Sequence, residues 1–303
     1  MIISGISQGL LWVSMAIGVF ITFRILDIPD LTAEGSFPLG AAVTISMILK
    51  GISPTWATLA GFLAGCIAGI VTGILDTKLH IPALLAGILT MTGLYSVNIH
   101  IMGRANLGLL TQKTIFDWVP ASWGLNSQTL IMGTGISLLV IMSLIAYFAT
   151  RNGLALMAVG NNAIMSAANG INVPAMKIIG YAVSNGLIAL SGSLVAQNNG
   201  FADIGMGVGT IVIGLASVLV GEIFLHTTKM IGKLLAMVAG AVLYRLLLTI
   251  AMSLGIAPDD LKILSAIILV IVIVLPMLQN RWLQHKAIAK YLNQTQVEEP
   301  TND

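Results

Sequence analysis

Three carboxylates and a serine lie close together between the first two apolar stretches of the sequence. They are Asp27, Asp30 and Glu34, followed by Ser36, in the segment LDIPDLTAEGS. Carboxylates within a membrane usually mark the path of an ion or a polar solute. In an ordinary turn at the membrane surface, the same three acids would simply be solvated. The sequence leaves both interpretations open, and we take Asp30, Glu34 and Ser36 as candidate pathway residues.

A further acid, Asp203, precedes closely spaced glycines in QNNGFADIGMGVGT and loosely echoes the segment around Asp30. Short, glycine-broken apolar segments at matching places in two halves of a chain are typical of a transporter's central site. Asp203 is therefore a fourth candidate for the pathway. The histidines are spread along the chain and predict no metal site.

Two short strings match enzyme motifs without the structural context that these motifs need. Gly5–Gly9 reads G-I-S-Q-G, but a serine-hydrolase nucleophile requires a strand before it. Gly205–Gly209 contains three glycines, but no βαβ unit surrounds them. No phosphate-binding G-x-x-x-x-G-K-[ST] motif occurs, so any ATP that the protein depends on must be hydrolysed by a partner. We predict a chain that is not an enzyme and binds no cofactor itself.

The composition indicates a protein that lies in a lipid bilayer. Of 303 residues, 57% are hydrophobic and 9% are charged, whereas a soluble domain has roughly 25% charged residues. The net charge is +2 and the basic residues are dispersed, so nucleic acid is not an expected partner.

Apolar runs predict an all-α, polytopic helical bundle, since a membrane-crossing helix needs about 20 apolar residues. Nine segments reach or approach this length: Gly5–Leu26, Phe37–Leu49, Pro54–Leu75, Pro82–Met102, Thr129–Ala149, Met176–Gln197, Val208–Leu225, Met230–Leu254 and Leu261–Leu278. Arg245 lies inside the eighth segment, where it either extends to the interface or pairs with an acid of another segment.

The second segment is too short to cross the membrane as a helix. Ser36 is placed to cap a helix with Pro38 in its first turn, ending near Lys50. About 14 residues give roughly 21 Å, less than the roughly 30 Å of the hydrocarbon core. The preceding chain must therefore enter the protein without helical structure, which is tolerated only inside protein or along a water-filled cavity.

The distribution of Lys and Arg predicts the orientation. The loops of one side carry nine basic residues and those of the other side carry four. The first set is Arg24, Lys78, Arg151, Lys177, Lys229, Lys233, Arg281, Lys286 and Lys290, and the second is Lys50, Arg104, Lys113 and Lys262. This bias places the N-terminus outside and the C-terminus, with the tail 281–303, in the cytoplasm.

Glycines recur every four residues in the third segment, at Gly61, Gly65, Gly69 and Gly73. This spacing puts them on one helix face, where the missing side chains allow another helix to approach closely. We interpret the face as a packing surface, with a dimer interface as the alternative.

A polar interruption, Thr150–Lys177, separates the fifth and sixth segments on the predicted cytoplasmic side. Asn161 or Asn162 can cap a short helix over 163–169, and Gly170 can end it. Small residues along that helix keep it thin enough to enter a groove on another protein.

The run AVGNNAIMSAANGINVPAMKIIGY resembles the cytoplasmic loop of permease subunits of bacterial binding-protein-dependent ABC importers, in the branched-chain amino acid and ribose class. The LDIPDLTAEGSFPLGAA segment is most similar to the putative tryptophan/tyrosine-type permeases of that class. The family pattern falls on Ala158, Gly160, Asn162, Gly170, Ile171, Val173 and Lys177. The chain departs from it at Ala163, where the family often has an acid.

The resemblance implies a single permease domain over 1–280, with 150–177 as a loop whose helix docks on a cytoplasmic ABC ATPase. The residues it assigns to ATPase coupling are Arg151, Gly160, Asn161, Asn162, Ala163, Ser166, Gly170 and Ile171. It also implies ATP and Mg on the ATPase, an external substrate-binding protein, a second permease copy, and the bacterial plasma (inner) membrane. The expected solute is a small amino-acid-like molecule.

A different class of transporter would use the same membrane carboxylates. An ion- or proton-coupled secondary transporter would couple solute movement to Asp30 or Glu34 and would need no ATPase. The sequence alone keeps this alternative open.

Overall fold

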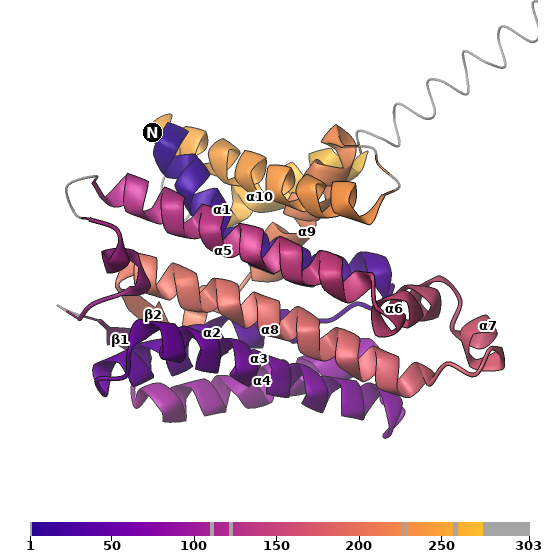
Figure 1. Cartoon of the computed structure of the whole chain (residues 1–303). Coiled ribbons are helices and arrows are strands. Elements are labelled where there is room, and N and C mark those ends of the chain that lie inside the picture. Colours follow the sequence, from indigo (N-terminus) through magenta and orange to yellow (C-terminus); the bar gives the residue numbers. More distant parts are fainter. Residues whose placement is uncertain are drawn as a thin grey trace, which may run out of the picture.

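The helices of the protein lie side by side in one elongated bundle (Figure 1). The computed structural model describes residues 2–109, 112–120, 124–225, 227, 229–256 and 260–274. The predicted tail, 281–303, lies outside the described residues.

Among these described residues, seven helical segments are long and apolar enough to cross a membrane, which makes this a polytopic helical membrane protein. They comprise α1 (Ile2–Phe20) with its π-helical extension η1 (Ile21–Ile25), α3 (Pro54–Thr77), α4 (Ala83–Met102), α5 (Leu125–Phe148), α8 (Val173–Asn199), α9 (Thr210–Phe224) with the preceding turn η4 (Ile204–Gly207), and α10 (Met230–Ser253). Two shorter apolar helices, α2 (Ala33–Leu49) and Leu261–Val274, occupy the second and ninth predicted segments. The number of crossings and the orientation of the termini stay predictions.

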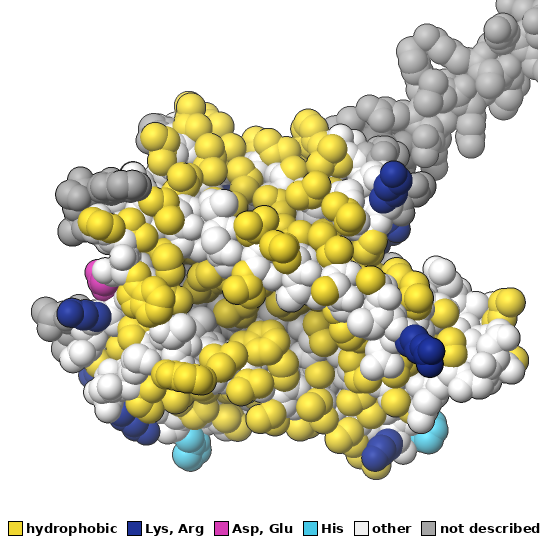
Figure 2. Space-filling view, viewed as in Figure 1, with side chains coloured by type: hydrophobic (Ala, Val, Ile, Leu, Met, Phe, Trp, Pro, Cys, Tyr) yellow, Lys and Arg dark blue, Asp and Glu magenta, His cyan; other side chains and the backbone are white. Residues whose placement is uncertain are grey.

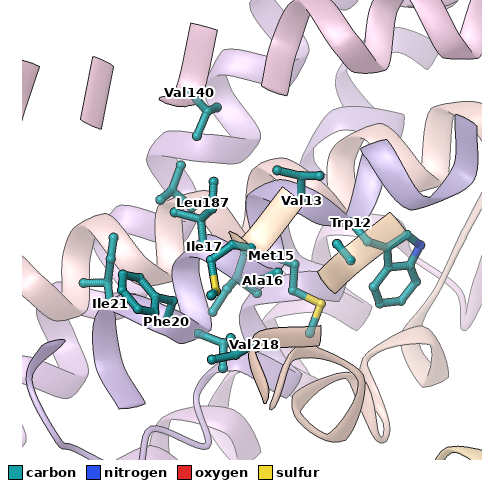
Figure 3. Packing of buried hydrophobic residues seen from close by; sticks show 14 of the residues in the cluster. Trp12, Val13, Met15, Ala16, Ile17, Phe20, Ile21, Val140, Leu187 and Val218 are labelled. Atoms are coloured by element: carbon teal, nitrogen blue, oxygen red, sulfur yellow. The ribbon is translucent and has the colours of Figure 1, made fainter. Parts of the chain in front are cut away.

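Helices α1 and α8 form the centre of the bundle. In each, 72% of the apolar stretch is buried, against 28% in α4 and 33% in α5. Figure 3 shows large side chains of α1, such as Trp12 and Phe20, packed together with Val140 of α5, Leu187 of α8 and Val218 of α9. The outer helices turn aliphatic side chains outward, and Figure 2 shows hydrophobic side chains across the middle of the visible face. This surface suits a lipid surrounding.

The two ends of the bundle differ. One end, called the α7 end here, carries the short helices α6 (Arg151–Asn161) and α7 (Ala163–Ala168). The other, the strand end, holds the N-terminus, η2 (Ile115–Trp118), and the strands β1 (Asn106–Gly108) and β2 (Phe201–Asp203) (Figure 1). The strands pair antiparallel, with Leu107 opposite Ala202. The all-α prediction missed this pair, because each strand is only three residues long.

Helix α2 begins earlier than predicted. It starts at Ala33, with Thr32 at its N-cap, so Ser36 lies within the helix and the predicted capping role of Ser36 is wrong. At 17 residues, or roughly 26 Å, α2 is still shorter than a membrane core. Pro38 has no N–H to bond to the carbonyl of Glu34, and Gly207 of η4 packs closely at that point.

The glycine face of α3 lies directly against α8. A Cβ added at Gly61, Gly65, Gly69 or Gly73 would meet an α8 atom within 2.2–2.9 Å. For Gly69 that atom is the backbone carbonyl oxygen of Tyr181, which cannot move aside as a side chain can. The face is thus occupied by α8 of the same chain, and glycine is required there for the close approach.

We predict that Gly69→Ala lowers stability by about 1–3 kcal/mol, because the added methyl group forces α3 away from α8. Gly93→Ala in α4 is the matched control, since a Cβ there meets no atom within 4 Å. Thermal unfolding of the purified protein in detergent measures both. An unchanged melting temperature for Gly69→Ala would contradict the packing argument.

Candidate functional site

The chain between η1 and α2 passes through the interior as a non-helical connector, residues 26–32. Ile28, Asp30 and Thr32 are buried, whereas Asp27 is exposed. Non-helical backbone at this depth requires protein around it, and the connector packs on α8, where Leu26 lies against Gly180. The predicted non-helical approach to α2 is therefore present, and it is enclosed by the protein.

Asp30 is the centre of a buried polar cluster. Its Oδ1 accepts a hydrogen bond from the Thr32 N–H at 2.9 Å, and its Oδ2 accepts one from Asn185 Nδ2 at 2.7 Å. Ser36 Oγ donates to Asn185 Oδ1 at 2.8 Å. Asn185 of α8 thus joins two of the predicted pathway residues. Because Asp30 is only 1% exposed, the interpretation of these acids as a solvated turn is wrong for this residue.

Three buried threonine hydroxyls extend this cluster across the bundle. Thr32 Oγ1 and Thr72 Oγ1 are 2.8 Å apart, and Thr72 Oγ1 donates to Thr90 Oγ1 at 3.0 Å. The polar contacts therefore run from α8 through the connector to α3 and α4. Buried polar groups need such partners, since an unpaired one costs the full free energy of its desolvation.

The other two predicted pathway acids lie elsewhere. Glu34 Oε1 accepts a hydrogen bond from the Gly209 N–H at 3.0 Å, which joins α2 to the beginning of α9. Asp203 belongs to the strand end, where its Oδ1 accepts from the Gly205 N–H at 2.7 Å and its Oδ2 from Asn106 Nδ2 at 3.1 Å. Asp30 and Asp203 each accept the N–H two residues further on, so the sequence echo has a local counterpart.

Two ion pairs lie near the α7 end. Arg24 Nε donates to Glu222 Oε1 at 2.8 Å, which joins η1 to the end of α9. Lys177 Nζ, at the start of α8, lies 3.5 Å from Asp76 Oδ2 at the end of α3. Two of the basic residues that predict the orientation therefore also connect helix ends.

Among the described residues Arg245 pairs with no acid, so that interpretation is wrong for them, and its extension to the interface stays a prediction. Its Nε and Nη2 donate to Gln8 Oε1 at 3.1 and 2.8 Å, and its guanidinium lies 5.4 Å from the ring centroid of Trp12. A neutral amide and an indole, both from α1, therefore hold a cation inside a membrane-crossing helix.

Capping residues divide the polar interruption into α6 and α7. Thr150 Oγ1 accepts from the Gly153 N–H at 3.3 Å, and Asn162 Oδ1 accepts from the Met165 N–H at 2.9 Å. Of the two candidate caps, the structure uses Asn162 and makes Asn161 the last residue of α6. Gly170 follows α7 with φ +81°, a conformation that glycine adopts without strain.

Helix α6 packs on the bundle, and α7 projects from it (Figure 1). Leu156 and Val159 of α6 are buried, and Gly160 touches the backbone of Ile25 so closely that any Cβ would overlap the Ile25 carbonyl oxygen. On α7, by contrast, Ile164 is 86% and Met165 is 65% exposed.

The predicted coupling residues therefore differ in how far they are exposed. Gly160 and Ser166 face the protein, and Ala163 and Ile171 are half-buried. Arg151, Asn161, Asn162 and Gly170 are exposed.

Comparison with known proteins identifies the family. A family model described as "Branched-chain amino acid transport system / permease component" matches residues 1–275. The chain belongs to this family of transport permeases. A "Tyrosine transport system permease protein" of Clostridioides difficile (strain R20291) is 41% identical over 269 residues, which cover 89% of each chain. "Uncharacterized protein RP368" of Rickettsia prowazekii (strain Madrid E) is 33% identical over 276 residues, covering 89% of this chain and 95% of the relative. No solved structure gives a significant match.

These comparisons confirm the resemblance drawn from the sequence. The protein is a multi-pass membrane permease component of an amino-acid type transport system.

Some residues that the structure makes prominent were missed from the sequence. Asn185, Gln197 and Gln8 have amide side chains inside predicted apolar segments. A polar side chain among apolar neighbours was the sequence signal that could have identified them. Ile164 and Met165 are large apolar residues inside a segment that is otherwise small and polar.

We predict that Asn185→Leu destabilises the permease by about 1–3 kcal/mol, because it leaves the buried Asp30 carboxylate and the Ser36 hydroxyl without their shared partner. A double-mutant cycle with Asp30→Leu measures the coupling by thermal unfolding. The double variant should lose less stability than the sum of the two single losses. Strictly additive losses would show that the two side chains do not support each other.

Proposed function

We propose that this permease is the membrane-spanning subunit of a bacterial ABC importer that takes up a small amino acid across the plasma (inner) membrane. The family match and the 41% identity to a tyrosine transport system permease support an amino acid of the tyrosine type as the solute. The chain has no phosphate-binding motif of its own, so ATP and Mg would bind on a separate ATPase.

The observation that carries the proposal is the projection of α7. A six-residue helix, capped by Asn162, extends from the bundle with Ile164 and Met165 largely exposed. Neither lies in a span that would meet lipid. Exposed apolar anchors on a thin, rigid element are typical of a contact with another protein. We assign this surface to the cytoplasmic ATPase.

The contacts behind α7 supply a route from the ATPase to the interior. Helix α6 precedes α7 directly, and its Gly160 presses on Ile25, immediately before the buried connector. A displacement of α7 would move α6 against the connector and thereby act on Asp30 and its partners. Alternating access in the proposed importer follows from such a rigid-body shift.

The remaining partners of the importer follow from the two ends of the bundle. An external binding protein would deliver the solute at the strand end, opposite α7. A second copy of the permease, with its own α7, would complete the complex and bind the second ATPase subunit. Asp30 and Ser36 would support the pathway by fixing the connector on α8, rather than by binding solute directly.

We predict that Ile164→Asp and Met165→Asp each weaken ATPase binding by about 2 kcal/mol or more, which is roughly 30-fold in affinity. Each places a charge where an apolar contact is expected. Leu254→Asp is the matched control. Leu254 is also an exposed aliphatic residue, 79% accessible, and it follows the C-terminal end of α10, away from α7. Co-purification with the ATPase measures the loss, and an unchanged yield from both α7 variants would contradict the docking site.

Reconstitution distinguishes the importer from an ion-coupled secondary transporter. The permease alone in liposomes should not accumulate tyrosine under a proton or sodium gradient, whereas the complex with its ATPase and binding protein should do so with ATP. Gradient-driven uptake by the permease alone would overturn the importer and assign the carboxylates to ion coupling.

A further inference from the structure

A polar pocket of about 380 Å³ opens at the strand end of the bundle, apart from α7 and from the Asp30 cluster. Four segments that are distant in sequence meet there: the start of α1, the η2 region, the start of α5 and the end of α8. Amide, hydroxyl and carboxylate side chains line most of it, including Gln8, Asp117, Gln128, Gln197 and Asn198. Its volume lies within the roughly 300–1,000 Å³ of small-molecule sites.

The pocket wall is held in place by its own hydrogen bonds. Gln197 Oε1 accepts from the Ile115 N–H at 3.0 Å, and its Nε2 donates to Thr58 Oγ1 at 2.8 Å. Gln128 Nε2 donates to the Val119 carbonyl at 2.8 Å. These bonds fix η2 against α3, α5 and α8. The pocket is therefore already formed before any ligand binds.

Two amides on this wall offer donors to an anion. Arg245 donates to Gln8 Oε1, and Thr129 Oγ1 donates to Asn198 Oδ1 at 2.8 Å. Within the part of the chain that the structure describes, these bonds engage the oxygens of Gln8 and Asn198 but not their amide nitrogens. Each nitrogen carries two N–H donors. The pairing of the oxygens fixes the orientation of both amides.

The charge behind Gln8 favours the same kind of ligand. Arg245 is half-buried, and its bonding partner Gln8 is neutral. Among the described residues, the ion pairs are made by Arg24 and Lys177, and no carboxylate pairs with Arg245. A cation in a membrane-crossing helix is costly without a counter-charge. A ligand carboxylate beside Gln8 would supply that counter-charge.

A negative charge, suited to the ammonium group of a ligand, lies on η2. Asp117 lines the pocket, and its Oδ2 accepts from the N–H and the hydroxyl of Thr114 at 2.6 and 3.0 Å. Its other oxygen remains to accept from an ammonium group. The buried ring of Phe116 adds an apolar surface to the lining.

We propose that this pocket binds a zwitterionic α-amino acid, with its carboxylate at the Gln8 and Asn198 amides and its ammonium group at Asp117. The choice of amino acid as ligand rests on the proposed function. The location, at the end opposite α7, makes it a first binding site for solute that arrives from the binding protein.

Three probes separate the two charged contacts. Equilibrium dialysis with the full-length permease in lipid nanodiscs measures binding of L-tyrosine, of tyramine, which lacks the carboxylate, and of 3-(4-hydroxyphenyl)propionate, which lacks the ammonium group. Tyrosine should bind about 10-fold or more tightly than either analogue, because each analogue loses a charge-assisted hydrogen bond. Equal binding of all three would overturn the proposal, as would a failure of every α-amino acid in a panel to bind.

Variants assign each contact to a residue. Gln8→Leu should weaken tyrosine binding about 10-fold and leave tyramine binding nearly unchanged, and Asp117→Asn should spare 3-(4-hydroxyphenyl)propionate instead. Thr92→Val is the control, since its exposed hydroxyl bonds only to its own helix. The same loss for all three probes would indicate a general disturbance and contradict the assignment.

The outcome is independent of the ATPase experiment. If the ATPase co-purifies but tyrosine does not bind specifically, the proposed binding site is wrong and the importer proposal stands. If tyrosine binds specifically but no ATPase associates, the importer proposal is wrong and the binding site stands.

Discussion

The hydrogen bond between Asp30 and Asn185 is the interaction on which the interior of this permease depends. Through it, a buried carboxylate on a non-helical connector is satisfied by an amide from the central helix α8. Without such a partner, neither the carboxylate nor the irregular backbone is tolerated at this depth. The bond therefore allows α2 to begin inside the protein and to be shorter than a full crossing.

The close packing of α8 places Asn185 where the connector can reach it. The glycine face of α3 brings the two backbones together, and the Asn185 carbonyl itself lies against Gly65. Small residues and a few amides hold helices together in a membrane, where burial of apolar surface gives little driving force. In this permease the glycine contacts and the amide contacts lie on the same helix, so packing and polar satisfaction depend on each other.

The same connector joins the α6 contact near the α7 end to the interior of the bundle. It begins beside α6, where Gly160 touches Ile25, and it ends at the start of α2, whose Glu34 bonds to the beginning of α9. The α7 surface and the polar pocket lie at opposite ends of the bundle, joined by α1 and α8. The connector thus carries the buried Asp30 and begins directly after the residue that Gly160 touches.

The sequence by itself determined the membrane class, the positions of nine apolar helices, the small helix that became α7, and the family. Each depends on neighbouring residues: apolar runs select a lipid environment, and caps such as Asn162 and Gly170 act within one helical turn. Only the tertiary structure decided what the polar side chains inside the long helices do. Ser36 bonds to a residue 149 positions away instead of capping α2, and Arg245 finds Gln8 237 positions away instead of an acid. Gly160 faces the bundle for the same reason, since the backbone it touches comes from η1. Contacts between residues so far apart in sequence depend on how the helices pack, and the local sequence pattern does not encode that packing.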